Sequence, residues 1–448
     1  MQGNITERRD QEDNAHDLQS TEDHMKSSLQ RVGERSKDKE RDEKAIESRN
    51  ALNGYTRSDW LIIALVGLTI VPFVFVVFFG MGNGSPFVVV AILGLAIVAA
   101  GFFLSWAVEG LETVMAQSLA LALLALIEVA PEYAVEITLA WRQQIELAAS
   151  SMTGANRLLL GLGWPLILFI AYFSARRRGE KFAEIQLDRR RSADILFLLI
   201  ASAYSFIIVL KGTLSLFDSA ILIFIYGAYI FTQLRRPRLD ADEMEEVGVG
   251  IGGRTKELRG AAKWITIGGF LAFGAFVLYF GAEPFIESIL DLARGLGVSQ
   301  FFMIQWVAPF LSEFPESLTA FLWAATVIFA AQGLGNLISS KLNQWTLLIA
   351  AIPIAYSLSV GKITAVQLTP QSVDELFLTA AQSLFGVALL LSQRFRLRDA
   401  VALLILFLIQ FVIPVEPIRV ILAWFYLGLA AVVLIRRRRE IGLFRKPR

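Results

Sequence analysis

Long apolar runs fill the chain between Trp60 and Ile435 and constrain its fold more than any other feature. Hydrophobic residues make up 55% of the sequence, and the mean hydropathy is +0.55. Because a helix needs roughly 20 apolar residues to cross a bilayer, the runs predict an all-α polytopic membrane protein with about twelve spans. These are expected at Trp60–Gly80, Pro86–Val108, Thr113–Trp141, Thr153–Ser174, Asp194–Val209, Thr213–Thr232, Trp264–Phe285, Val298–Ala330, Gly333–Val360, Val373–Ser392, Ala400–Val415 and Ile418–Ile435.

Polar segments divide the chain into two membrane halves, 60–232 and 264–435, joined by a linker at 233–263. Residues 1–59 carry 11 Lys/Arg and 14 Asp/Glu and have almost no apolar run. This composition is typical of a disordered, solvated tail. A second, basic tail covers 436–448.

Loops rich in Lys and Arg alternate with loops poor in them along the twelve predicted spans. With a cytoplasmic N-terminus, the inside loops and the C-terminal tail hold 24 Lys and Arg, whereas the outside loops hold four. Cytoplasmic loops carry the excess of Lys and Arg, so we expect an even number of spans and both termini in the cytoplasm. The expected location is the plasma (inner) membrane of a prokaryote. Topology accounts for the basic runs, so the lipid bilayer is an expected partner and nucleic acid is not.

The sequence contains no cysteine, and its two histidines, His16 and His24, both lie in the polar tail. Thiolate metal sites, disulfides, iron–sulfur clusters and histidine chemistry inside the membrane are therefore excluded. No Gly-x-Ser-x-Gly motif occurs either. We expect a protein that is not an enzyme and has no cofactor, and any site in the membrane must use carboxylates, hydroxyls, amides or backbone.

One segment of the sequence occurs twice. Residues 107–141 and 282–323 each combine an acidic helical approach, a long apolar run and a Pro-Glu pair, Pro131-Glu132 or Pro315-Glu316. A segment of small residues follows each proline at a distance that differs by a single position between the copies. The copies begin five predicted spans apart and so enter the membrane from opposite sides. Inverted repeats of this kind build transporters, with the site at the repeat interface near the midplane.

The Pro-Glu pairs predict broken helices and buried charge. Proline inside a helix removes a hydrogen bond and clashes with the preceding turn, so each span should break there and free carbonyls for a cation. A charge at the bilayer centre costs roughly 2.5–3.5 kcal/mol on insertion scales. The glutamates placed there without a Lys or Arg beside them in sequence are Glu128, Glu132, Glu313 and Glu316. Glu136 shares a helical face with Glu128 and Glu132, but it either joins the site or lies in the vestibule.

These residues resemble the calcium/cation antiporter superfamily, which includes sodium/calcium and proton/calcium exchangers. The family pattern is close to Gly-Thr-Ser-Leu-Pro-Glu, with Gly-Ser-Asn in the next helix, and here it reads as Ile127–Glu132 and Leu311–Glu316. The resemblance covers two alpha-repeats, about 107–175 and 282–358. It implies an inverted-repeat exchanger fold, with a ten-helix core and about one extra span at each end.

The resemblance also implies a cation site. Glu132 and Glu316 would take the two central coordinating positions, and Ser312 would stand where the family has a threonine hydroxyl. Glu128 occupies the equivalent place in the first repeat, and Glu313 replaces a serine of the family pattern. The implied cation ligands are Glu128, Glu132, Asn156, Ser312, Glu313, Glu316 and Ser340. Whether Glu136, Lys341, Asn343 or Gln344 joins them stays open.

The departures from the family pattern bear on the transported ions. Carboxylates replace hydroxyl and amide ligands, and calcium binds six to eight oxygens, mostly from carboxylates and carbonyls. Clustered glutamates also bind protons readily, because like charges disfavour ionisation. The prediction is a secondary active antiporter that exchanges Ca²⁺ or Na⁺ for protons by alternating access. The alternatives are a sodium-driven calcium exchanger and, more remotely, a cation channel.

Two basic residues near the predicted site have competing interpretations. Lys341 either pairs with Glu313 or Glu316 in place of a cation, or lies at the end of its helix and extends its ammonium to the interface. Arg157, just inside the fourth predicted span, is interpreted as an interfacial anchor rather than a ligand.

Overall fold

The structure is a computed structural model that describes residues 55–80, 85–111, 127, 129–188, 191–235, 251–258, 260–413 and 415–437. Contacts within the chain define two units, Met1–Ser58 and Asp59–Arg448. Only residues 55–58 of the first unit are described, so the predicted tail lies outside the described residues, as does most of the basic tail from residue 438.

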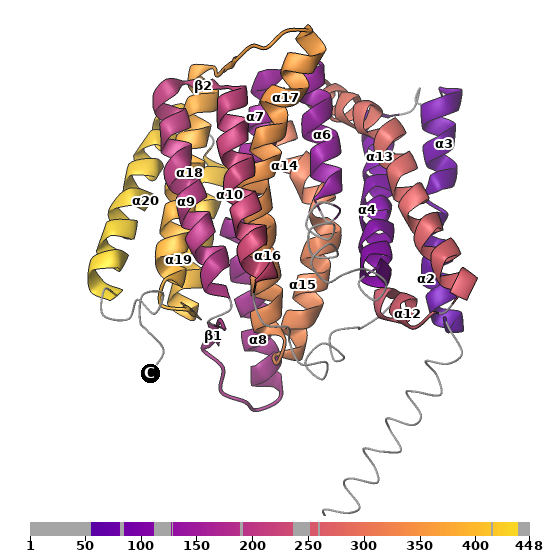
Figure 1. Cartoon of the computed structure of the whole chain (residues 1–448), viewed down its shortest axis with the longest axis horizontal. Helices are drawn as coiled ribbons and strands as arrows, with labels where there is room; N and C mark the ends of the chain where they lie inside the picture. The colour runs from indigo at the N-terminus through magenta and orange to yellow at the C-terminus, as the bar shows by residue number, and fades with distance from the viewer. Residues whose placement is uncertain are drawn as a thin grey trace, which may run out of the picture. The chain divides into compact units, whose positions relative to one another are not determined.

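The second unit is built almost entirely of helices that run side by side (Figure 1). The first half contains α2 (Arg57–Gly67), α3 (Ile70–Phe79), α4 (Pro86–Leu111), α6 (Ala130–Trp141), α7 (Ile145–Leu158), η1 (Leu159–Gly163), α8 (Trp164–Arg177), β1 (Glu184–Gln186), α9 (Ser192–Lys211), β2 (Thr213–Leu214) and α10 (Leu216–Leu234). The linker contains α12 (Ile251–Glu257). The second half contains α13 (Gly260–Leu296), α14 (Gln300–Ser312), α15 (Phe314–Thr326), α16 (Ala330–Asn343), η3 (Gln344–Leu348), α17 (Ile349–Val360), β3 (Val366–Gln367), α18 (Pro370–Leu390), β4 (Arg394–Arg396), α19 (Leu397–Val412) and α20 (Glu416–Arg437).

Within the described residues, eight helices are long and apolar enough to cross a membrane. Four of the twelve predicted spans, the third, eighth, ninth and eleventh, are not among them. Residues 113–126 and 128 of the third span lie outside the described residues, and the eighth is divided into α14 and α15. The ninth consists of α16, η3 and α17, and α19 is only 16 residues long. The polytopic α-helical fold is confirmed.

A helix begins at each Pro-Glu pair, and at the second pair the predicted break is seen on both sides. α14 ends at Ser312, Glu313 lies between the helices, and α15 begins at Phe314 with Pro315 in its first turn. In the first repeat, α6 likewise begins at Ala130, immediately before Pro131. Proline is well tolerated in the first turn of a helix, where its missing N–H would have had no intrahelical acceptor. Each pair therefore starts a half-helix.

Two short antiparallel sheets reveal the inverted relation of the repeats. β1 pairs with β4, aligning Ile185 with Phe395, and β2 pairs with β3, aligning Leu214 with Val366. When α4 and α13 are counted as the first helix of each five-helix repeat, β1 and β3 each follow the third span, whereas β2 and β4 each follow the fourth. β1 and β3 are therefore counterparts, as are β2 and β4, so the β1–β4 sheet of one end corresponds to the β3–β2 sheet of the other. Because β1 and β2 lie at opposite ends of the helices (Figure 1), the repeats have opposite orientations.

A one-turn π-helix follows the small-residue segment in each repeat. η1 begins at Leu159 in the first repeat, and η3 begins at Gln344 in the second. Counted from Pro131 and Pro315, these starts differ by a single position, as the two small-residue segments do. π-Helical turns are rare and occur mostly at functional sites. Their matched positions mark the same region of each repeat as irregular.

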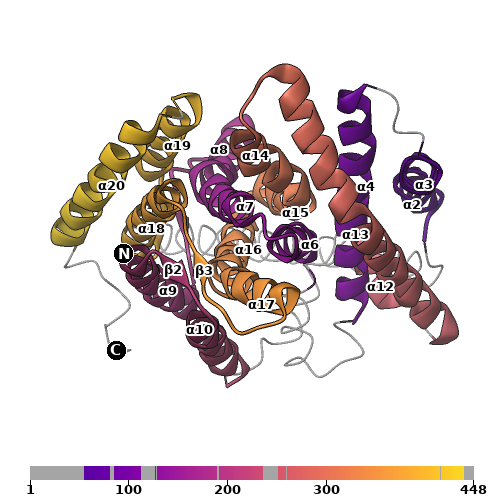
Figure 2. The same cartoon turned by 90° about the horizontal axis from the view of Figure 1, so that it is seen from above.

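The first helices of the two repeats, α4 and α13, pack against each other (Figure 2). Small residues let them approach: a Cβ atom at Gly274 would lie 2.5 Å from Cγ of Leu104. On the outside of the unit, large apolar side chains are exposed, as Leu65 is at 71% and Leu210 at 86%. Such a surface is stable against lipid tails rather than water.

Candidate functional site

Glu132 lies in the first turn of α6 and is 4% exposed. Its Oε2 atom has no hydrogen-bond partner among the described residues. Ser312, the last residue of α14, lies beside this carboxylate and forms a side-chain contact with it. The structure therefore brings together predicted ligands from the first repeat, Glu132, and from the second, Ser312.

Glu316 occupies the corresponding place in α15 and is half-buried. Its Oε2 accepts a hydrogen bond from the Ser340 hydroxyl at 2.8 Å, and its Oε1 accepts one from Nδ2 of Asn336 at 3.4 Å. Both donors lie on α16, one helical turn apart. Ser340 thus forms a hydrogen bond with Glu316, another of the predicted ligands. Asn336 was not predicted, although its place one turn before Ser340 was a usable signal.

Glu313 lies at the break between α14 and α15 and is 2% exposed. Its Oε1 accepts a hydrogen bond of 2.9 Å from the amide of Gln344, the first residue of η3. Electrostatic interactions connect it with Glu132, Glu316 and Lys341. Glu313 thus lies near the central glutamates of both repeats, and Gln344 is its hydrogen-bond partner.

Asn156 and Lys341 meet inside the protein. Asn156 is fully buried on α7, and its amide nitrogen donates to the Met152 carbonyl at 3.0 Å. The Lys341 ammonium donates to the backbone oxygen of Asn156 at 3.0 Å and to its Oδ1 at 3.2 Å. Lys341 is also fully buried. The interpretation that its ammonium reaches the interface is therefore wrong.

Tyr133 and Asn343 also join the repeats, because the tyrosine hydroxyl donates to Oδ1 of Asn343 at 2.8 Å. The sequence left Asn343 open and did not single out Tyr133, which directly follows Glu132. Tyr133 follows Glu132 in the sequence, and Asn343 is the last residue of α16, the helix that carries Ser340. Asn343 is 1% exposed, so this contact lies within the protein.

The structure describes Glu136 but not Glu128, the two further glutamates predicted near the site in the first repeat. Glu128 lies outside the described residues, so its predicted place in the site stays a prediction. Glu136 is fully buried, and neither of its carboxylate oxygens has a hydrogen-bond partner among the described residues. An exposed vestibule position for Glu136 is therefore wrong.

Arg157 is not an interfacial anchor, as the sequence had indicated. Its side chain is 2% exposed, forms an ion pair with Glu375 of α18, and stacks on Trp306 with its guanidinium carbon 5.1 Å from the ring centre. Arg419 of α20 pairs with the other oxygen of Glu375 at 2.9 Å. The prediction failed because Glu375 lies in the other half of the chain and no local pattern connects it to Arg157. The cluster binds α7 to α18 and α20.

The described residues contain no group of three Asp, Glu, His or Cys side chains close enough to share one metal ion. In this arrangement Glu132, Glu313 and Glu316 are neighbours whose oxygens do not converge on one point. Serine hydroxyls lie against them instead: Ser312 contacts Glu132, and Ser340 contacts Glu316. A cation bound here needs such oxygens, or a movement of the half-helices, to complete its ligand shell.

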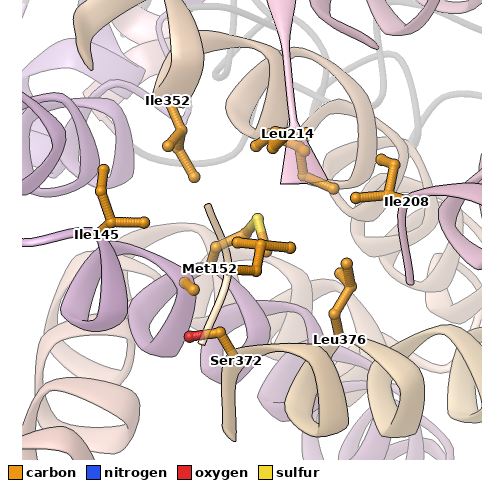
Figure 3. Close-up of a pocket in the computed structure, with 10 residues that line it drawn as sticks. Ile145, Met152, Ile208, Leu214, Ile352, Ser372 and Leu376 are labelled. Carbon is orange, nitrogen blue, oxygen red and sulfur yellow. The ribbon is translucent and has the colours of Figure 1, made fainter. Parts of the chain in front are cut away.

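A small apolar pocket lies elsewhere, between α7, α9, α17 and α18 (Figure 3). Ile145, Met152, Ile352 and Leu376 point into it, and Ser372 is its one polar lining residue. Without a carboxylate, the pocket offers nothing that compensates a cation for its lost hydration. It is therefore separate from the glutamate site.

The fold and the glutamates define a membrane transporter built from two inverted repeats, with buried carboxylates where the repeats meet. The sequence matches the family model described as sodium/calcium exchanger protein over residues 85–235 and 266–415. The chain belongs to this family of cation exchangers, within the calcium/cation antiporter superfamily, as its motifs predicted. Its relatives are ion exchangers of membranes rather than enzymes.

Two solved structures illustrate the likeness. The chain is similar to the crystal structure of the H⁺/Ca²⁺ exchanger CAX, with 34% identity and a TM-score of 0.80 over 86% of this chain and 96% of that one. It also resembles the Ca²⁺/H⁺ antiporter protein YfkE, with 15% identity and a TM-score of 0.56 over 80% of this chain and 98% of that one. The second likeness concerns the fold alone. No curated protein matches the sequence.

Proposed function

We propose that the protein exchanges Ca²⁺ for protons by alternating access at the buried glutamates of the two repeats. The observation that carries this proposal is the burial of Glu132 and Glu313, which are 4% and 2% exposed and make no ion pair among the described residues. An unpaired ionised carboxylate is very costly in such surroundings. Each of these groups therefore holds either a proton or a cation.

Competition between the two occupants is what couples their transport. A carboxylate that binds Ca²⁺ has released its proton, and a carboxylate that has regained its proton has lost much of its attraction for Ca²⁺. If only the occupied forms move between the two sides, each Ca²⁺ carried in one direction is exchanged for protons carried in the other. The likeness to the H⁺/Ca²⁺ exchanger CAX supports the same pair of ions.

The proposed ligands come from both repeats. Glu132 and Glu316 are the central carboxylates, Glu313 links them, and the hydroxyls of Ser312 and Ser340 lie against the two central groups. Asn156 takes part through its contact with Lys341, and Glu128 remains a proposed ligand outside the described residues. The breaks before α6 and α15 give each Pro-Glu pair a helix N-terminus whose orientation can change.

Substitution of the central carboxylates tests the site. In proteoliposomes with an acidic interior and no sodium, the wild-type chain should accumulate Ca²⁺. Glu132→Gln and Glu316→Gln keep side-chain size but cannot exchange a proton for a cation, so uptake should fall to that of protein-free liposomes. Glu146→Gln, an exposed residue in the first turn of α7, is the matched control and should retain wild-type uptake. Full activity in both central variants would refute the site.

A further inference from the structure

A buried ion pair lies next to the helix that contacts Glu316. Asp194, in the first turn of α9, is fully buried. Its Oδ2 pairs with Nη1 of Arg191 at 3.2 Å, and its Oδ1 accepts a hydrogen bond of 2.6 Å from the amide of Gln233 on α10. A buried carboxylate is stable only when such partners surround it. The cluster therefore fixes the place of the Arg191 guanidinium.

This guanidinium lies directly against α16. A Cβ atom at Gly335 would lie 2.5 Å from Nε of Arg191, so the absence of a side chain there makes room for it. Nη1 of Arg191 donates to the hydroxyl of Ser339 at 3.4 Å, and that hydroxyl donates to the Gly335 carbonyl at 3.2 Å. Gly335 and Ser339 are one helical turn apart and share one face of α16. The ion pair thus contacts this face at two successive turns.

The residues that follow these two in the sequence contact Glu316. Asn336 and Ser340, also one turn apart, donate to its two carboxylate oxygens. Successive helical residues point about 100° apart, so α16 presents one pair of residues to Arg191 and the next pair to Glu316. A shift of α16 against Arg191 would therefore move both donors relative to the carboxylate. Binding sites need their groups held to about 0.5 Å.

A similar pair occurs at the equivalent contact of the other two helices. α9, the fourth helix of the first repeat, packs against α16, in the third span of the second, and α18 and α7 have the reverse relation. Near the start of α18, the fully buried Glu375 pairs with Arg157, the residue after Asn156 on α7. In both places a buried carboxylate and an arginine lie beside a proposed ligand. The recurrence favours a role at the site over a chance contact.

We propose that Asp194 and Arg191 are positioning residues of the exchanger site. They hold α16 where Asn336 and Ser340 meet Glu316, and so set the affinity of the site for Ca²⁺ without touching the cation. The inference rests on the proposed function, because it concerns the same site.

The concentration dependence of uptake separates positioning from stability. In sodium-free proteoliposomes with an acidic interior, Arg191→Gln should raise the Ca²⁺ concentration for half-maximal uptake about tenfold, the effect of weakening a hydrogen bond to a charged group. A role in stability alone would reduce the amount of active protein, and so the maximal rate, without moving this concentration. Arg176→Gln removes an exposed arginine from the last turn of α8 and should behave as the wild type.

Two further variants test the route through α16. In a Ser340→Ala background, Arg191→Gln should shift the half-maximal concentration much less than in the wild type, because the hydroxyl that it positions is already absent. Gly335→Ala keeps every charge but places a methyl group against the guanidinium. It should reproduce the shift even if Arg191→Gln does not fold.

Two results would overturn the inference. One is an unchanged half-maximal concentration in whichever of Arg191→Gln and Gly335→Ala fold, and the other is full additivity of Arg191→Gln with Ser340→Ala. Failure of the proposed function is a different result, since the wild-type chain itself would then accumulate no Ca²⁺ under these conditions.

Discussion

Single residues determine how closely the two repeats meet. A Cβ atom at Gly154 would lie 1.8 Å from the backbone oxygen of Gln305, so only glycine fits where α7 touches α14. Gly154 lies just before Asn156 in the chain, and Gln305 directly precedes Trp306, on which Arg157 stacks. The contact joins helices of opposite repeats through their backbones. Neither side can yield by changing a rotamer.

Gly154→Ala should therefore destabilise the protein strongly. Overpacking costs about 1–3 kcal/mol, occasionally more, and a clash between two backbones belongs at the upper end of that range. The apparent melting temperature in detergent should fall clearly. Gly227→Ala is the control, because a Cβ atom there meets nothing within 4 Å and alanine favours helix. Equal melting temperatures for Gly154→Ala and wild type would contradict the close approach.

At the scale of elements, a buried charge cluster fixes α20, the extra helix after the second repeat. Glu375 of α18 is fully buried between Arg157 of α7 and Arg419 of α20, which are 2% and 11% exposed. At the other end of α20, Arg437 pairs with Asp399 of α19 at 2.6 Å. The extra helix is thus attached at both ends by arginines to helices of the second repeat.

Glu375→Gln should destabilise this part of the molecule. The change leaves two guanidinium groups close together in the interior, and the loss of one partner from a buried ion pair costs about 3–5 kcal/mol. Asp291→Asn is the matched control, since Asp291 and Arg294 form an exposed pair on α13, and such pairs contribute about 0–1 kcal/mol. Unfolding in detergent should separate the two variants. A control as damaging as Glu375→Gln would indicate a general effect of charge removal.

At the scale of the whole membrane unit, polar contacts join chain segments at each of the two ends of the helices. Arg178, which follows α8, donates to the carbonyl of Thr326, the last residue of α15, at 3.0 Å, at the end where β1 pairs with β4. Arg142, after α6, pairs with Glu287 of α13 at 2.7 Å. The charge alternation had placed the two segments of each contact on the same side of the membrane. Both contacts are consistent with the predicted topology, and the even number of spans stays a prediction.

Chemical labelling tests this sidedness, and the absence of native cysteine makes the wild type a blank. Glu180→Cys, in the exposed loop before β1, should react with a membrane-impermeant thiol reagent from the cytoplasmic side only, where basic loops are retained. Lys362→Cys, in the exposed loop before β3, should react from the opposite side only. Labelling of both from one side would refute the alternation.

Local patterns predicted much of this architecture. The Pro-Glu pairs indicated the helix breaks, because proline acts within a single turn, and their repetition indicated the inverted halves. Ser340 and Glu316, both predicted as ligands, form a hydrogen bond, while their role as ligands stays a prediction. Other features depend on pairings across the fold: Lys341 meets Asn156 of the opposite repeat, and Arg157 of α7 meets Glu375 of α18. No periodicity within one helix reports which distant side chain faces it.

Proton movement caused by Ca²⁺ tests the central claim most directly. Purified protein is placed in sodium-free vesicles that contain a pH-sensitive dye, and Ca²⁺ is added outside. If buried carboxylates hold either a proton or Ca²⁺, Ca²⁺ should enter as protons leave, the interior should become alkaline, and Glu132→Gln should abolish the signal. Calcium entry without any pH change, or entry only when sodium is supplied inside, would contradict exchange of Ca²⁺ for protons.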